Sequence, residues 1–316
     1  MTPSILDTWF FDGSVEKRPG LPDKAATDNF LLRVTKPTSA NTGPRIAEAS
    51  LTNYAGSFSN AAAGSKISGL AITGQINALN PNVTYSDCLV KMGANPNPGT
   101  TYLGIKANNA SLATGLRFEH CEIRPSVNSV DHYGIQGRGF TLYRCEITGV
   151  VDGVVAHGTS TFMGAVSLQG NFIHDLRHFK NDPRQTTEPE GDSHDDGGQI
   201  EGKLDIEIIG NTIWGGYTSA ILVTQNVGTY ERVAIEDNWL DQENPIGGSV
   251  VNISEKGLGP INNLSLIRNK FGRTGTGFRI IMPSTTRLAA TSNIPTSGPD
   301  ANVYEDNGAF VSITNG

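Results

Sequence analysis

The sequence is poor in charged, aromatic and sulfur-containing residues. Charged residues make up 17% of the 316 positions and aromatic ones 7%, and the charged share lies below the roughly 25% of ordinary globular chains. Three cysteines without a CxxC pair are too few for a disulfide framework or a zinc ribbon. No apolar run of about 18 residues predicts a membrane span. A net charge of −7 without a basic block argues against a nucleic-acid partner.

The chain is instead rich in residues that favour turns and short strands. It contains 37 glycines and 16 prolines, together with many Asn, Thr and Ser residues. This composition argues against an all-helical protein. The first residues have no basic stretch ahead of an apolar core, so no secretory signal peptide is predicted. We therefore expect a protein that stays inside its host cell or leaves it by another route.

One short pattern recurs along the chain: apolar, any, apolar, two of any kind, Asn or Cys, any, apolar. Its anchor residues are Cys88, Cys121, Cys145, Asn171, Asn211, Asn238 and Asn269, with a degenerate eighth copy at Leu288 to Asn293. The alternation within each copy has the period of a strand. Anchors that recur every few tens of residues indicate a stacked solenoid. Because the repeated unit is a strand, the solenoid predicted is a parallel β-helix.

The anchors are predicted to point inward where the chain bends between two strands. A buried Asn amide can bond to its neighbours above and below and to the bent backbone, forming a polar ladder. Cysteine is a small apolar substitute at the same corner, so no redox or metal role is predicted for it. We expect an irregular leader or docking segment over residues 1–45 and a β-helix over 46–316. Residues 46–76 would form the first coil and cap, and the tail from Asn302 the last partial coil.

Polar residues concentrate in the middle of the chain. The longest gap between anchors runs from Asn171 to Asn211 and predicts an inserted loop near residues 174–196. Long loops on rigid scaffolds commonly carry recognition or catalysis. All six histidines lie between His120 and His194. We therefore expect the functional surface on these coils.

A second spacing, Asp, four residues, a polar residue and then Gly, occurs in three places. It predicts two stacked rows: one of Asp131, Asp152 and Asp196, and one of Gln136, His157 and Glu201, with Thr224 and Ser254 as extensions of the second row. Rows of acids and amides one strand spacing apart suit sugar hydroxyls. The same aspartates can instead close turns through Asx hydrogen bonds, and the sequence slightly favours that structural interpretation over catalysis.

Several segments resemble right-handed parallel β-helix proteins of actinobacteria and their tailed phages. In the phages, such β-helix proteins are minor tail proteins. The resemblance rests on the corner repeats and on segments 35–45, 193–202, 235–241, 256–261 and 268–273. It implies an all-β, right-handed parallel β-helix, a homotrimer, and a virion component assembled in the host cytoplasm beside other tail proteins. Pectate lyases and polygalacturonases share the general β-helix pattern, so the pattern alone does not define a chemistry.

The resulting hypothesis is a tail protein that binds a polysaccharide or glycolipid of the host envelope. The predicted ligand-binding residues are Asp131, Gln136, Asp152, His157, His194, Asp196 and Glu201. The alternative is a polysaccharide depolymerase, a hydrolase or lyase, with Asp195, Asp196, Glu201 and His157 as candidate catalytic residues. His157-Gly158 loosely resembles the polygalacturonase arrangement, but the Asn-Thr-Asp and Arg-Ile-Lys elements of that family are missing. A lyase would need a base, for which His194, Arg177 and Lys180 are candidates.

No cofactor or metal is predicted. Asp192, His194, Asp195 and Asp196 lie close together in sequence, but they match no spaced metal-ligand motif and fit a solvated loop equally well. Whether the protein is an enzyme is left open, with a binding role favoured. A third possibility is a purely architectural tail component.

Overall fold

The computed structural model describes most of the chain from residue 31 onward. The described residues are 31–59, 61–107, 114–158, 164–185, 191–202, 204–230, 232–242, 249–261, 263–272, 279–282, 301–306 and 309–312. Apart from a helical turn at 31–34 and the 3-10 helix η2 (Glu48–Ser50), the elements are short β-strands. No helix in these ranges is both long enough and apolar enough to cross a bilayer.

The strands form three sheets. Sheet A contains β1 (Thr52–Tyr54), β3 (Leu70–Ile72), β6 (Leu89–Met92), β9 (Glu122–Pro125), β12 (Glu146–Thr148), β15 (Phe172–His174), β18 (Thr212–Ile213), β21 (Trp239–Leu240), β24 (Lys270–Phe271), β26 (Val303–Asp306) and β27 (Ala309–Ser312). Sheet B contains β4 (Ile76–Asn77), β7 (Tyr102–Ala107), β10 (His132–Gly137), β13 (Val154–Ala156), β16 (Asp196–Ile200), β19 (Ser219–Thr224), β22 (Val251–Ser254) and β25 (Ile280–Ile281). Sheet C contains β2 (Lys66–Ser68), β5 (Thr84–Ser86), β8 (Leu116–Glu119), β11 (Phe140–Tyr143), β14 (Gly164–Gln169), β17 (Leu204–Ile209), β20 (Arg232–Glu236) and β23 (Leu264–Ile267).

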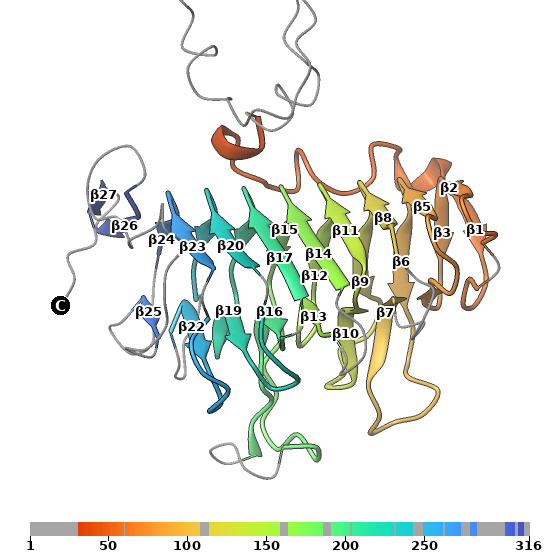
Figure 1. Ribbon diagram of the computed structural model, residues 1–316. Helices are drawn as coiled ribbons and strands as arrows, with labels where there is room; N and C mark the ends of the chain where they lie inside the picture. The colour runs from red at the N-terminus through yellow and green to blue at the C-terminus, as the bar shows by residue number, and fades with distance from the viewer. Residues whose placement is uncertain are drawn as a thin grey trace, which may run out of the picture.

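The chain visits the sheets in rotation, from C to A to B, and each new strand pairs in parallel with the equivalent strand one coil earlier. Thus β8, β9 and β10 make one coil, and β11, β12 and β13 make the next (Figure 1). The final pairing, β26 with β27, is antiparallel and ends the stack as a hairpin. The fold is the right-handed parallel β-helix that the sequence predicted.

The repeated apolar positions stack as inward columns. On sheet C, Tyr85 pairs with Phe118, Phe118 with Leu142, and Leu142 with Leu168. All are buried in one continuous core, and the rings of Tyr85 and Phe118 stack with centroids 5.1 Å apart. Both hydrogen-bonding edges of each strand face a neighbouring strand in the stack. The backbone N–H and C=O groups of each coil therefore depend on the adjacent coils for their hydrogen bonds.

The anchor amides form the predicted ladder at the corner between sheets C and A. Asn211 Oδ1 accepts the backbone N–H of Asn171 at 2.9 Å and its side-chain N–H at 2.9 Å. Asn211 Nδ2 donates to the carbonyl of Leu168 on the preceding coil and to Oδ1 of Asn238 on the next. The same set of bonds repeats at Asn238 and Asn269. Every ladder asparagine is completely buried.

The cysteines occupy the ladder positions of the earlier coils, as predicted. Sγ of Cys145 lies 3.3 Å from the carbonyl of Phe118, where an asparagine amide would donate. Cysteine therefore keeps the donor and loses the acceptor. The thiols are free and buried, and burial raises the pKa of Cys121 far above its ordinary value. An inert structural role fits this environment.

The residue before each anchor has left-handed backbone. Asp87, His120, Arg144, Asp237 and Arg268 have φ between 51° and 59°, and Gly170 and Gly210 have φ of 64° and 66°. A left-handed residue turns the chain sharply enough for the next side chain to point inward. This corner backbone, with the amide behind it, is the repeated unit of the fold.

The position predicted for the eighth anchor is wrong. Asn293 lies outside the described residues, and Asn302 takes the next ladder position, where its Oδ1 accepts the backbone N–H of Asn269 at 3.0 Å. Its Nδ2 donates to the carbonyl of Leu266. The coil that follows Asn269 is therefore longer than the sequence suggested. Asn302, where the tail coil was predicted to begin, is its anchor.

Residues 31–50, here called the strap, run along the outside of this corner. Figure 1 shows the strap as the red-to-orange chain crossing the ends of several coils. Arg33 bonds to Asp237 at 2.9 Å, Ser39 to Glu146 at 2.6 Å, and Arg45 to Asp87 at 2.6 Å. The strap thus ties distant coils together. Residues 1–30 lie outside the described ranges, and a docking role for residues 1–45 stays a prediction.

Two corner glycines make room for the strap. A Cβ on Gly210 would lie 2.0 Å from the backbone oxygen of Leu32, and one on Gly170 would lie 2.5 Å from the Leu32 side chain. Leu32 itself is buried at 3% exposure. The two corners without a side chain are thus the ones over which Leu32 packs.

Replacing Asn211 by alanine should destabilise the protein by about 3–5 kcal/mol, because each buried partner left without a hydrogen bond costs about 1–3 kcal/mol. Asn211→Cys, which retains a donor, should cost less. Urea unfolding measures both, with Asn53→Ala on the exposed face of β1 as the matched control expected within about 0.5 kcal/mol of the parent. A loss in Asn211→Ala no greater than that of the control would contradict the ladder's role.

Gly210→Ala should loosen the strap. Gly64 provides the control, because it has a similar φ of 72° but nothing within 4 Å of a new Cβ. Both substitutions carry the left-handed backbone cost of about 1–2 kcal/mol, and only Gly210→Ala displaces Leu32. Limited trypsin digestion should therefore cut after Arg33 or Arg45 faster in Gly210→Ala than in Gly64→Ala. Equal cleavage rates would show that the strap does not depend on this contact.

Candidate functional site

The outer face of sheet B carries a groove with a volume of about 560 Å³. Its walls are the loop ahead of β7, the inserted loop between β15 and β16, and the turn after β22. It is lined by Thr101, Tyr133, Gln136, Asp152, Val155, Gln185, His194, Gln199, Glu201, Leu222, Thr224, Asn226, Asn252, Ser254 and Lys256. Amides, hydroxyls and carboxylates dominate this lining, and apolar side chains are few.

Strand register places the groove residues in two rows. One row follows Gln136, Val155, Gln199, Leu222 and Asn252, which are successive partners across β10, β13, β16, β19 and β22. The other contains Glu201, Thr224 and Ser254, two residues further along. Outward side chains on a parallel sheet repeat every two residues and every coil, so the groove floor is a regular grid, here called the polar grid, whose only apolar members among the lining residues named above are Val155 and Leu222.

A column of glycines lies on the same strands as the groove floor. Gly104, Gly134, Gly153 and Gly197 stand in line on β7, β10, the entry to β13 and β16. A Cβ on Gly153 would lie 2.6 Å from both the carbonyl oxygen of Gly197 and a methyl group of Ile173. The glycines therefore let sheet B approach the isoleucines of sheet A.

Of the two predicted rows, the members from the later coils align and those from the first do not. Asp152 and Asp196 each precede a column glycine, and His157 lies beside Glu201. Gln136 instead pairs with Val155, two residues ahead of His157, so it belongs to the row of Gln199. Asp131 is shifted by the same amount. The repeated spacing was real, but it did not set the offset between β10 and β13.

Asp131 has a local structural role. Its Oδ2 accepts hydrogen bonds from the side chain of Asn95 at 3.0 Å and from the backbone of Gly99 at 3.1 Å. These bonds hold the loop ahead of β7, which supplies Thr101 to the groove. For this aspartate the turn-closing interpretation raised from the sequence fits its contacts.

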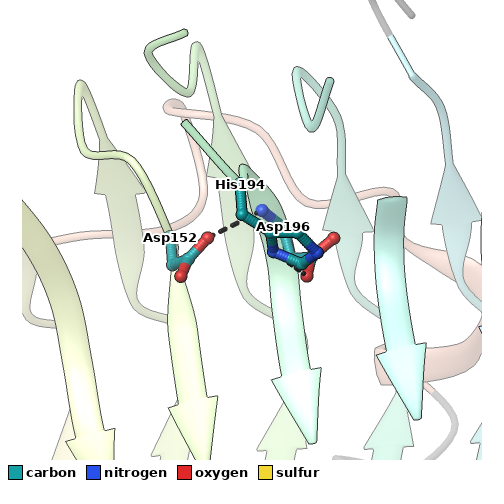
Figure 2. Close-up of side chains that lie close together, drawn as sticks. All are labelled: Asp152, His194 and Asp196. Carbon is teal, nitrogen blue, oxygen red and sulfur yellow. Dashed lines mark hydrogen bonds and ion pairs between the residues drawn. The ribbon is translucent and has the colours of Figure 1, made fainter. Parts of the chain in front are cut away.

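Asp152, His194 and Asp196 meet in the groove wall (Figure 2). Asp196 donates its backbone N–H to Oδ1 of Asp152 at 2.8 Å, and His194 Nδ1 lies 3.1 Å from Oδ2 of Asp196. Both carboxyl groups are buried, at 4% and 0% exposure. Burial, followed by the nearby charge of Asp196, raises the pKa of Asp152 well above its usual value. Two side chains of this cluster, Asp152 and His194, reach the groove.

Asp195 points the other way, into the base of the inserted loop. Its carboxylate accepts Ser193 Oγ at 2.6 Å and lies 2.5 Å from His178 Nδ1. The His178 ring also contacts Asp192 at 3.2 Å and stacks on Tyr217. Burial raises the pKa of Asp195 to about 7, although both hydrogen bonds oppose that shift. Asp195 thus fastens the loop and does not line the groove.

The inserted loop is tied to the coils at a second point. Arg184 binds Asp182 through two nitrogens, donates to the carbonyl of Val130, and lies over the Tyr133 ring at 5.3 Å. Phe179 and Ser193 join the two arms of the loop. These contacts present Gln185 and His194 to the groove. In Figure 1 the loop is the green extension beyond β13 and β16.

The remaining candidates divide between the groove and its surroundings. Glu201 lines the groove and accepts the side-chain amide of Gln199 at 2.8 Å. His157, at the end of β13, contacts the carbonyl of Gly158. Neither it nor Arg177 and Lys180, the bases considered for a lyase, belongs to the described groove lining.

Sequence reasoning missed much of the lining, including Gln199, Leu222 and Asn252 on the strands. The glycine column held the missing signal. Aligning Gly134, Gly153 and Gly197, instead of the preceding aspartates, places Gln136 opposite Val155 and Gln199. Gln185 and Lys256 come from loops, whose positions no strand period predicts.

Three comparisons with known proteins bear on this description. A scan against models of protein families, a search of curated proteins and a search of solved structures each found no match. The fold therefore rests on the strand pairing described above, and the similarity to phage tail proteins remains the resemblance noted in the sequence.

Proposed function

We propose that the groove on sheet B binds a polysaccharide or glycolipid of a host cell envelope. The observation that carries this proposal is the polar grid of its floor, in which Gln199 and Asn252 stand in one row and Glu201 and Thr224 in the next. Sugars offer closely spaced hydroxyls that both donate and accept, and amides and carboxylates are their natural partners. The groove lining also crosses the successive strands β10, β13, β16, β19 and β22, an extent that suits a chain-like ligand.

The biological setting proposed with this activity is the tail of an actinobacterial phage. The sequence resemblance supports it, together with a homotrimer and contacts to other tail proteins. Host attachment needs binding without turnover, and this favours a binding role over an enzymatic one. Mass spectrometry of purified virions tests these assignments, because a tail protein must be present in the particle.

A polysaccharide depolymerase is the second candidate. The observation in its favour is that two carboxyl groups, those of Asp152 and Glu201, line one groove of about 560 Å³, and that the buried carboxyl group of Asp196 lies next to Asp152. Glycoside hydrolysis uses two carboxyl groups flanking the scissile bond. New reducing ends or unsaturated products after incubation with actinobacterial cell-wall glycan would establish cleavage. Asp196→Asn and Glu201→Gln should then abolish cleavage while the glycan is still retained.

The double variant Gln199→Ala/Asn252→Ala should lower retention on insoluble cell-wall glycan about tenfold, since two lost hydrogen bonds of about 0.7 kcal/mol each correspond to that factor. A co-sedimentation isotherm with the full chain measures it. The control is Thr141→Ala/Gln169→Ala, which removes similar groups from the outer face of sheet C. Failure of the parent protein to bind, or an equal loss in the control, would remove the groove proposal.

A further inference from the structure

We propose that Asp152, His194 and Asp196 bind a divalent transition-metal ion, with zinc the best match. The inference goes beyond glycan binding and does not depend on it. It rests on the geometry, the donor chemistry and the burial of these three side chains.

The geometry gathers three donors from separate parts of the chain. Asp152 comes from the entry to β13, His194 from the end of the inserted loop and Asp196 from the start of β16. One ligand atom of each lies within 4.8 Å of the others. Figure 2 shows the Asp152 carboxyl group directed toward the other two side chains. Four ligands held tetrahedrally at about 2.1 Å from zinc stand about 3.4 Å apart, so a small closure of the side chains completes the site.

The donor set selects the class of ion. Zinc binds imidazole nitrogen and carboxylate oxygen at about 2.0–2.2 Å, commonly with three protein ligands and one open position. Calcium and magnesium prefer sites made of oxygen ligands alone. The histidine therefore favours zinc or a neighbouring transition metal over either of these ions.

The state of Asp152 is a second observation that points to a ligand. Asp152 is 4% exposed, and Oδ1 accepts the N–H of Asp196. Within the part of the chain that the structure describes, Oδ2 receives no hydrogen bond, and Asp152 forms no ion pair with lysine or arginine. Buried carboxylates are ordinarily paired or coordinate a metal. A cation held with His194 and Asp196 would supply the missing partner.

The site opens on one side only. Asp152 and His194 line the groove, and Asp196 lies behind them with no exposed surface. A fourth ligand, a water molecule or a ligand oxygen, would therefore enter from the groove. The neighbouring His178 does not offer an equivalent site, because its two ring nitrogens already contact Asp195 and Asp192.

The test is zinc binding by the full chain after treatment with a chelator and its removal. Titration with zinc chloride against a chromophoric competitor should give one ion per chain. Asp152→Asn and His194→Ala should each weaken binding by at least about tenfold. The matched controls are His120→Asn, at the corner between sheets C and A, and Asp205→Asn on sheet C, which should bind as the parent does.

Thermal unfolding with and without zinc provides the second measurement. Zinc should raise the melting temperature of the parent and of both controls, and should raise it less in His194→Ala, provided that all variants melt cooperatively without metal. Three results would overturn the proposal: no zinc bound by the parent at submillimolar concentration, unchanged affinity in both site variants, or equal losses in the controls. Asp152→Asn that is more stable than a parent unable to bind zinc would show two carboxyl groups sharing a proton instead.

Discussion

At the later corners between sheets C and A, from Asn171 onward, a buried asparagine accepts the backbone N–H of the preceding coil's anchor and donates to a carbonyl of that same coil. Both bonds are short and both partners are buried, so neither can exchange with water. A coil displaced by one residue would lose this set of bonds and turn its apolar side chains outward. The corner therefore fixes the height and the register of every coil that follows it.

The groove inherits its regularity from that corner, although it lies on another sheet. Once the coils are in register, the glycine column brings sheet B against sheet A, and the residues on the opposite side of sheet B form the polar grid. Gln199 and Asn252 take their places in the row from this stacking. The inserted loop is different, because it depends on specific side chains. His178 and Arg184 attach it to the coils at two separate points.

The sequence predicted the parts of the structure that repeat. The seven anchors from Cys88 to Asn269 were found because a buried amide and its flanking apolar residues must recur once per coil. Asn302 was missed because the last coil is long and the intervening residues offered a false match at Asn293. The row of Gln136 and His157 failed for another reason. Spacing within a strand cannot reveal the offset between two strands, which the contact between Gly134 and Gly153 determines. The sequence predicted that Asp152 and Asp196 stand in one row and named His194 as a ligand-binding residue, but it gave no position for His194, because the inserted loop and not a strand period brings that side chain to the two aspartates.

The strap changes how such a molecule has to be made. In a solenoid, stability is normally shared only between adjacent repeats, and a nascent chain can fold coil by coil as it emerges. Here Arg33 bonds to Asp237, which lies 204 residues later in the chain. Arg33 is therefore synthesised well before its partner. The part of the strap that holds Arg33 can therefore dock only after the coil of Asp237 has formed, whereas Arg45 can bond to Asp87 much earlier. The final docking of Arg33 closes a loop around nearly the whole stack and couples the unfolding of coils that never touch one another.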